Sequence, residues 1–193
     1  MASGIRVTNS DSRYGICTKT LHWVMFLLIL MQFVVAWAML SMDEWETTAG
    51  LAQSTLYEWH KSVGLVALAV ALGRYLWRKA APLPHWAPNL TPGEKRAIHG
   101  IERTLYLCLF LMPASGFVFV MAGDYPIDFF SLGYVPNVIG VHPALSRIAQ
   151  WTREITAGLL VATLFGHWGL AVRHQWTHRD RYLQRMLPFT HQR

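Results

Sequence analysis

Long apolar runs separated by polar connectors dominate the hydrophobic pattern of this chain. The clearest run extends from Ile155 to Val172, where 18 residues carry no formal charge. A helix of that length rises by ~27 Å, which is about the hydrocarbon thickness of a bilayer. The pattern predicts four membrane-spanning helices, at about residues 20–41, 56–78, 98–122 and 150–174.

The connectors contain residues that favour turns and loops. Four prolines between residues 82 and 92 interrupt the segment after the second run, so this segment cannot be helical throughout. Within the third run, Pro113 and Gly116 predict a bend. Residues 123–149 form a longer loop that is rich in glycine, proline and aromatic residues. Loops of this length are commonly functional or packed against another surface.

Basic residues gather at one end of the predicted spans. The other two connectors hold mainly Arg147 and Arg153, against several acids that include Asp43, Glu44 and Glu46. By the positive-inside rule, both termini are therefore cytoplasmic. We expect an all-α fold with one domain over residues 1–193, a transmembrane four-helix bundle of up-down-up-down topology. The cations at the cytoplasmic end are Arg6, Arg13, Lys19, Lys79, Lys95, Arg96, Arg173, Arg179, Arg181, Arg185 and Arg193.

Composition supports the membrane interpretation. Hydrophobic residues make up 53% of the 193 and charged residues only 15%, whereas soluble domains carry about 25% charged residues. The net charge of +6 does not indicate nucleic-acid binding, because the basic residues flank apolar segments instead of forming a soluble basic face. The first run, Leu21 to Leu40, is too long for a signal peptide and we expect it to be retained. Cys17 and Cys108 lie far apart in sequence, which predicts free thiols.

His167 is the titratable side chain of the fourth apolar run. An imidazole at membrane depth needs a partner, and the usual reasons to keep one are a metal, a proton path or an interhelical hydrogen bond. His22, just inside the first span, is expected at a matching depth. Neutral imidazoles from two helices can take both axial positions of a b-type haem iron in a helical bundle. Zinc is not indicated, because it requires three or four clustered ligands.

The other histidines differ in their expected positions. His60 begins the second span and is expected near the opposite membrane face from His22. His142 lies in the loop before the fourth span, and His174 follows His167 by two helical turns on the same face. Neighbouring glycines would let a flat macrocycle approach the backbone, although they also suit ordinary helix packing; they are Gly64, Gly166 and Gly169. The histidines expected at a solvated surface are His85, His99, His178 and His191.

Several motifs follow one another in a recognisable order: RYGxxxKTLHW, then EWHKSVG with GRYLWR at the end of the same span, then GH in the fourth span and the tail RDRYLQRMLP. In this order and in loop character, the chain from about Arg13 to Pro188 resembles bacterial cytochrome b561. The resemblance implies a four-helix protein of the bacterial inner (cell) membrane that binds two b haems and exchanges electrons with quinone.

The resemblance also implies haem ligands. The cytoplasmic-side haem would lie between His22 and His167. The outer haem would be held by His60 and by a histidine fourteen residues before the ligand of the fourth helix, but that position is Arg153 here. A further family histidine, four residues before the tyrosine of the third helix, is replaced by Glu102.

The presence of the whole EWHKSVG segment around His60 favours an outer haem, but three alternatives stay open for this site. His142 folds back as the partner of His60, or the outer haem is five-coordinate, or only the inner haem is present. Arg153 itself would pair with a haem propionate, pair with Glu154, or be solvated at the start of its helix.

The predicted function is electron transfer through haem b, to or from ubiquinone, and whether the chain is itself an enzyme is left open. Superoxide is one electron donor suggested by the resemblance, but few outer cations are present to attract it. We expect a quinone site near the cytoplasmic ends of the third and fourth helices, at His174 and Ser115. Alternatively, His174 only caps the C-terminus of its helix.

The competing hypothesis is a haem-containing anchor or accessory subunit. It would dock a dehydrogenase or a larger respiratory or photosynthetic complex through loop 123–149. A helical bundle without haem is a third alternative. The expected partners, besides haem and ubiquinone, are membrane lipid, a protein bound to that loop and a second copy of the chain.

Overall fold

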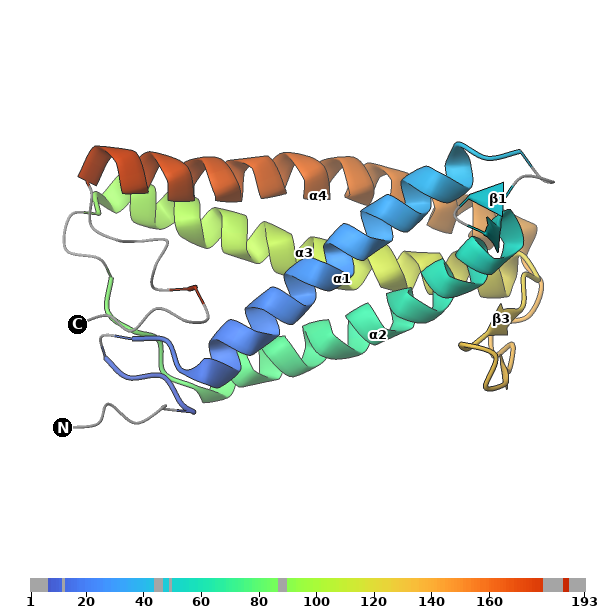
Figure 1. The fold of residues 1–193 in the computed structure, drawn as a ribbon, viewed down its shortest axis with the longest axis horizontal. Coiled ribbons are helices and arrows are strands. Elements are labelled where there is room, and N and C mark those ends of the chain that lie inside the picture. Colours follow the sequence, from blue (N-terminus) through green and yellow to red (C-terminus); the bar gives the residue numbers. More distant parts are fainter. Residues whose placement is uncertain are drawn as a thin grey trace. The chain divides into compact units, whose positions relative to one another are not determined.

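Four long helices make up most of the computed structural model, which describes residues 7–11, 13–43, 47–48, 50–86, 90–178 and 186–187. The helices are α1 (Ile16–Leu40), α2 (Gln53–Ala80), α3 (Pro92–Ala122) and α4 (Pro143–His178) (Figure 1). Two short antiparallel strand pairs lie in the connections: β1 (Thr47–Thr48) with β2 (Leu51–Ala52), and β3 (Ile127–Asp128) with β4 (Tyr134–Val135). The expected all-α fold is confirmed.

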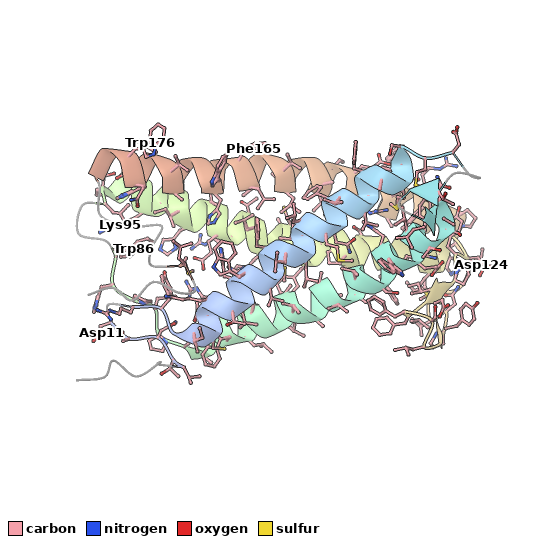
Figure 2. All side chains as sticks on the ribbon, viewed as in Figure 1. Asp11, Trp86, Lys95, Asp124, Phe165 and Trp176 are labelled. Carbon is pink, nitrogen blue, oxygen red and sulfur yellow. The ribbon has the colours of Figure 1, made fainter. Side chains whose placement is uncertain are left out.

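Three helices, α1, α3 and α4, are long and apolar enough to cross a membrane. Their large apolar side chains are exposed: Trp37 on α1 is 74% exposed and Phe165 on α4, labelled in Figure 2, is 67% exposed. Thr163 is buried instead and donates a hydrogen bond to the Leu159 carbonyl of its own helix. Extensive exposed apolar surface, together with a buried hydroxyl that bonds to its own helix backbone, is typical of a membrane protein.

The second predicted span, α2, is long but less apolar than the other three helices. Its uncharged stretch is confined to residues 62–73, between Lys61 and Arg74. That α2 crosses the membrane therefore stays a prediction.

All four helices begin earlier than the predicted spans, and the differences are largest for α3 and α4, because of their N-terminal residues. α3 starts at Pro92 instead of about 98, behind a capping box in which Glu94 accepts from the Thr91 amide (2.9 Å) and the Glu94 amide donates to Thr91 Oγ1 (3.3 Å). α4 starts at Pro143 instead of about 150, and the Ser146 amide donates to the His142 carbonyl (3.0 Å). Proline suits the first helical position, because its missing N–H would have no helical partner there.

The chain divides into two compact units, each built from segments of all four helices. The first, called the His22 unit, comprises Met1–Val24, Leu72–Cys108 and Gly158–Arg193. The second, called the His60 unit, comprises Met25–Ala71 and Leu109–Ala157.

Polar contacts join the helices within the His22 unit. Trp77 Nε1 of α2 donates to Thr18 Oγ1 of α1 at 2.9 Å. Arg78 Nε of α2 donates to Glu102 Oε1 of α3 at 2.8 Å. Glu102, which stands where the resemblance led us to expect a histidine, therefore has a structural role as an ion-pair partner.

A short part of the basic tail also belongs to the His22 unit. Trp23 Nε1 donates to the Met186 carbonyl at 2.8 Å, and Lys19 Nζ donates to the Leu187 carbonyl at 3.1 Å. The remaining tail residues from 179 onward lie outside the described residues, as do Arg6 and the acidic residues Glu44 and Glu46.

In the His60 unit, the side chains that flank His60 on α2 hold the hairpin of β3 and β4. Phe130 in this hairpin has φ 51°, a left-handed conformation that is uncommon for a bulky residue. Its amide is fixed by the buried Ser62 hydroxyl, which supports that conformation. The contacts to the hairpin are Asp128 N to Glu58 Oε2 (3.1 Å), Ser62 Oγ to the Asp128 carbonyl (3.1 Å), Phe130 N to Ser62 Oγ (3.1 Å) and Lys61 Nζ to the Pro126 carbonyl.

Replacing Ser62 by alanine should loosen this hairpin. The change leaves the Asp128 carbonyl and the Phe130 amide without their partner, which costs about 1–3 kcal/mol for a buried group. Thermal unfolding in detergent should shift to lower temperature, and limited proteolysis should cut residues 123–142 faster. The matched control is Thr104→Ala, whose exposed hydrogen bond to the Gly100 carbonyl should matter little. Equal effects of the two substitutions would contradict the proposed role of Ser62 in holding the hairpin.

Candidate functional site

His22 of α1 and His167 of α4 lie next to each other in the His22 unit. Their ring centroids are 6.3 Å apart and their planes are inclined by 52°. Imidazole nitrogens bind metals at ~2.0–2.1 Å, as measured for zinc, which puts two opposed rings roughly 6 Å apart. The two histidines therefore lie side by side, in agreement with the sequence prediction of matching depth, and their spacing suits a shared metal centre.

Arg74 of α2 adds a cation to this histidine pair. Its Nη2 lies 3.2 Å from His22 Nδ1, and its guanidinium carbon lies 5.8 Å from the ring centroid of Tyr106 on α3. A guanidinium can only donate hydrogen bonds, so Nδ1 is the acceptor and Nε2 of His22 is not covered by it. Sequence reasoning missed Arg74 as a site residue, although the GRYLWR motif that contains it was noted.

The glycines beside the candidates differ in their surroundings. At Gly169, two residues after His167, an added Cβ would meet nothing within 4 Å, and the His167 side chain is itself exposed. At Gly166 an added Cβ would lie 3.5 Å from Ile101, an ordinary packing distance. Residues two apart on a helix point about 200° apart, so the open space at Gly169 lies on another face of α4 than the His167 side chain. Gly166 is explained by helix packing. The glycines beside His167 therefore do not add to the evidence for a haem.

The His60 unit holds a different pair. Arg153 Nη2 of α4 lies 3.0 Å from His60 Nε2 of α2. His60 Nδ1 is buried and has no hydrogen-bond partner among the described residues. Gln32 of α1 donates to the His60 carbonyl at 3.0 Å. The structure thus places Arg153 opposite His60, where the resemblance led us to expect a histidine, and gives it a ring nitrogen as partner.

The structure places His142 at the start of α4, where its side chain is exposed. Its amide donates to the Ala122 carbonyl at 2.9 Å and its own carbonyl accepts from Ser146 at 3.0 Å. In the described part of the chain, the side chain that contacts a ring nitrogen of His60 is Arg153. His142 therefore lies immediately before α4, and its carbonyl accepts a hydrogen bond from the first turn of that helix.

His174 and Ser115, expected in one quinone site, belong to different units. His174 lies in the His22 unit, is buried, and interacts electrostatically with Glu94 of α3. Ser115 lies in the His60 unit and donates to the Met112 carbonyl at 3.0 Å. Residue 115 is near the C-terminal end of α3, away from the Pro92 start of that helix. The structure therefore does not gather the two side chains in one unit.

The histidines expected at the surface have local partners. His85 contacts the Asp11 carbonyl through Nδ1 at 3.1 Å. The ring centroids of His99 and Trp86 are 5.0 Å apart, in an edge-on arrangement. Figure 2 labels Asp11, Trp86 and Lys95, which lie at one end of the His22 unit. The side chain of His178, like the whole of His191, is outside the described residues.

No group of three or more histidine, cysteine, aspartate or glutamate side chains gathers as a metal site within the described ranges. Cys17 and Cys108 are free thiols, as expected. The histidine pair in the His22 unit therefore offers two imidazoles and not the three or four clustered ligands of a zinc site.

Comparisons with known proteins agree with this description. A model of the family described as prokaryotic cytochrome b561 matches residues 13–189. Cytochrome b561 homolog 2 of Escherichia coli (strain K12) is 27% identical over 180 residues, which cover 93% of this chain and 94% of the relative. Because the family match extends over nearly the whole chain and three of its helices can cross a membrane, the chain belongs to the prokaryotic cytochrome b561 family, whose members are b-type membrane cytochromes of electron transfer.

Proposed function

We propose that His22 and His167 are the axial ligands of a b haem and that the chain transfers electrons between this haem and ubiquinone. The observation that carries the proposal is the 6.3 Å separation of the two imidazoles. When bound, haem supplies one-electron chemistry at its iron. His22 and His167 would hold the haem through their ring nitrogens, and the surrounding apolar helices would provide a shell of low dielectric constant.

Arg74 has two roles in this proposal. It donates to His22 Nδ1, which orients the ring. When Nε2 binds a metal, neutral imidazole carries its proton on Nδ1, and Nδ1 no longer accepts. The guanidinium of Arg74 is then available for a carboxylate, and a haem propionate is a suitable partner for its fork geometry.

Charge distribution supports a bacterial inner-membrane orientation with both termini cytoplasmic. Of 17 lysines and arginines, 14 fall in the sequence ranges of the His22 unit, with four of the 11 acids. The ranges of the His60 unit hold Lys61, Arg147 and Arg153 with seven acids. By the positive-inside rule, the His22 unit faces the cytoplasm. This orientation fits one domain over residues 1–193 with four spans in up-down-up-down order.

His174 is the residue we propose for proton exchange with ubiquinone. It follows His167 by two turns on α4, is buried, and interacts electrostatically with Glu94. A histidine is suited to this step, because its charge changes near neutral pH. Superoxide has less support as the electron donor, because Lys61 is engaged by Glu58 and the Pro126 carbonyl, and Arg153 by His60.

A role as an anchor or accessory subunit is the second candidate, and one observation favours it. The connection between α3 and α4 exposes large apolar side chains: Leu132 is 83% and Tyr134 is 75% exposed. Such a surface suits a bound protein, which could be a dehydrogenase, a larger complex or a second copy of the chain, as well as lipid. A purified chain that reacts with quinone by itself would favour the carrier role over the anchor role.

Replacing either His22 or His167 by alanine should abolish the same haem. Each substitution removes one of two axial ligands, so the bis-histidine absorption bands of the reduced protein should disappear. The measurement is a pyridine haemochrome count together with a redox-titrated absorption spectrum of the purified chain.

The matched control is His99→Ala, which removes an exposed histidine of the same unit that contacts Trp86. This variant should keep the haem content and spectrum of the wild type. If His22→Ala and His167→Ala lose different haems, or if neither loses any, the proposed pairing is wrong.

Replacing His174 by alanine should slow reaction with quinone while leaving haem in place. Loss of a general acid or base costs ~10²-fold or more in rate. The measurement is the oxidation of the pre-reduced protein by a soluble ubiquinone analogue in stopped flow, with the haem count as a parallel readout. An unchanged rate would argue that His174 has only a structural role at the end of α4, as would a loss of haem that accounts for the slower reaction.

A further inference from the structure

We propose that this chain binds a single b haem, at His22 and His167, and that Arg153 closes the His60 site to a second one. This inference rests on the proposed function of the His22 unit. The family resemblance implies two haems, and we attribute the loss of the second haem to the Arg153 side chain.

The ring nitrogen of His60 that would bind iron is already occupied. Arg153 Nη2 donates to His60 Nε2 at 3.0 Å. A guanidinium keeps its protons in proteins, so Nε2 must supply its lone pair to this hydrogen bond. The proton of the neutral ring is then on Nδ1, which is buried without a hydrogen-bond partner among the described residues. At His22, by contrast, the arginine contacts Nδ1 and does not cover Nε2.

The Arg153 side chain also fills the space beside His60. It extends from α4 past Gly116 of α3, where an added Cβ would lie 3.8 Å from its Cδ and 3.9 Å from its Nε. On α2, an added Cβ at Gly64 would lie 3.2 Å from Nε2 of Gln32. Both glycines, which would otherwise let a flat macrocycle approach the backbone, are therefore covered by polar side chains.

The His60 unit offers no second imidazole for an iron at this site. Its sequence ranges contain two histidines, His60 and His142. His142 is exposed at the start of α4, and its backbone is fixed by the Ala122 carbonyl. The ring nitrogen Nε2 of His60 is contacted by Arg153 and not by His142.

The EWHKSVG motif has a structural explanation that does not require a haem. Glu58, Lys61 and Ser62 all bind the hairpin of β3 and β4. Retention of these residues around His60 therefore preserves the connection between α3 and α4. With one haem, the electron donor and the electron acceptor both react at the His22 unit.

The test is the number of haems per chain in the purified full-length protein. The wild type should give one haem by pyridine haemochrome and one component in redox titration. His60→Ala should also give one. Arg153→His, which supplies an imidazole opposite His60 and removes the cation, should raise the count to two, with a second component in the titration.

Arg153→Gln is the matched control, because it removes the charge without supplying a ligand, and it should stay at one. Two haems in the wild type would overturn the inference while leaving the proposed His22–His167 pair intact; zero haem in the wild type would instead defeat the proposed function. A count of one in an Arg153→His protein that keeps the wild-type haem spectrum would reject Arg153 as the excluding residue. If that variant fails to fold, the wild-type and His60→Ala counts still decide the haem number.

Discussion

A polar side chain within an apolar helix must find its partner inside the protein, because the hydrocarbon of a bilayer offers none. This constraint accounts for the polar contacts of His22, His60 and Thr163. His22 is held by Arg74, His60 by Arg153, and the buried Thr163 by its own helix backbone. The outward surface is left to residues such as Trp37 and Phe165. The histidines are therefore found where an arginine from another helix can contact them.

The two arginine–histidine pairs show how one type of contact can support different chemistry. In the His22 unit, the guanidinium contacts Nδ1 and a second imidazole lies 6.3 Å from the first. In the His60 unit, the guanidinium contacts Nε2 and extends past Gly116. The difference of one ring nitrogen separates Arg74, which leaves the proposed iron-binding nitrogen of His22 uncovered, from Arg153, which contacts that nitrogen of His60.

The hairpin of β3 and β4 changes the interpretation of a whole motif. Sequence reasoning connected EWHKSVG with a haem on His60, since the motif surrounds that residue. The structure instead directs Glu58, Lys61 and Ser62 to the hairpin. Residues that are adjacent in sequence need not serve the same site, because successive side chains of a helix point about 100° apart and meet different neighbours.

The sequence by itself determined the all-α fold and the approximate helix ranges, because hydrophobic periodicity is a local property of the chain. The family, and with it the proposed pairing of His22 with His167, followed from the order of the sequence motifs. The sequence also identified position 153 as the departure from the family pattern. Only the tertiary structure decided that Arg74 completes the histidine pair, that Arg153 contacts Nε2 of His60, and that Glu102 pairs with Arg78. These contacts join residues 24 to 93 positions apart in sequence, and they depend on side-chain directions that no local pattern contains.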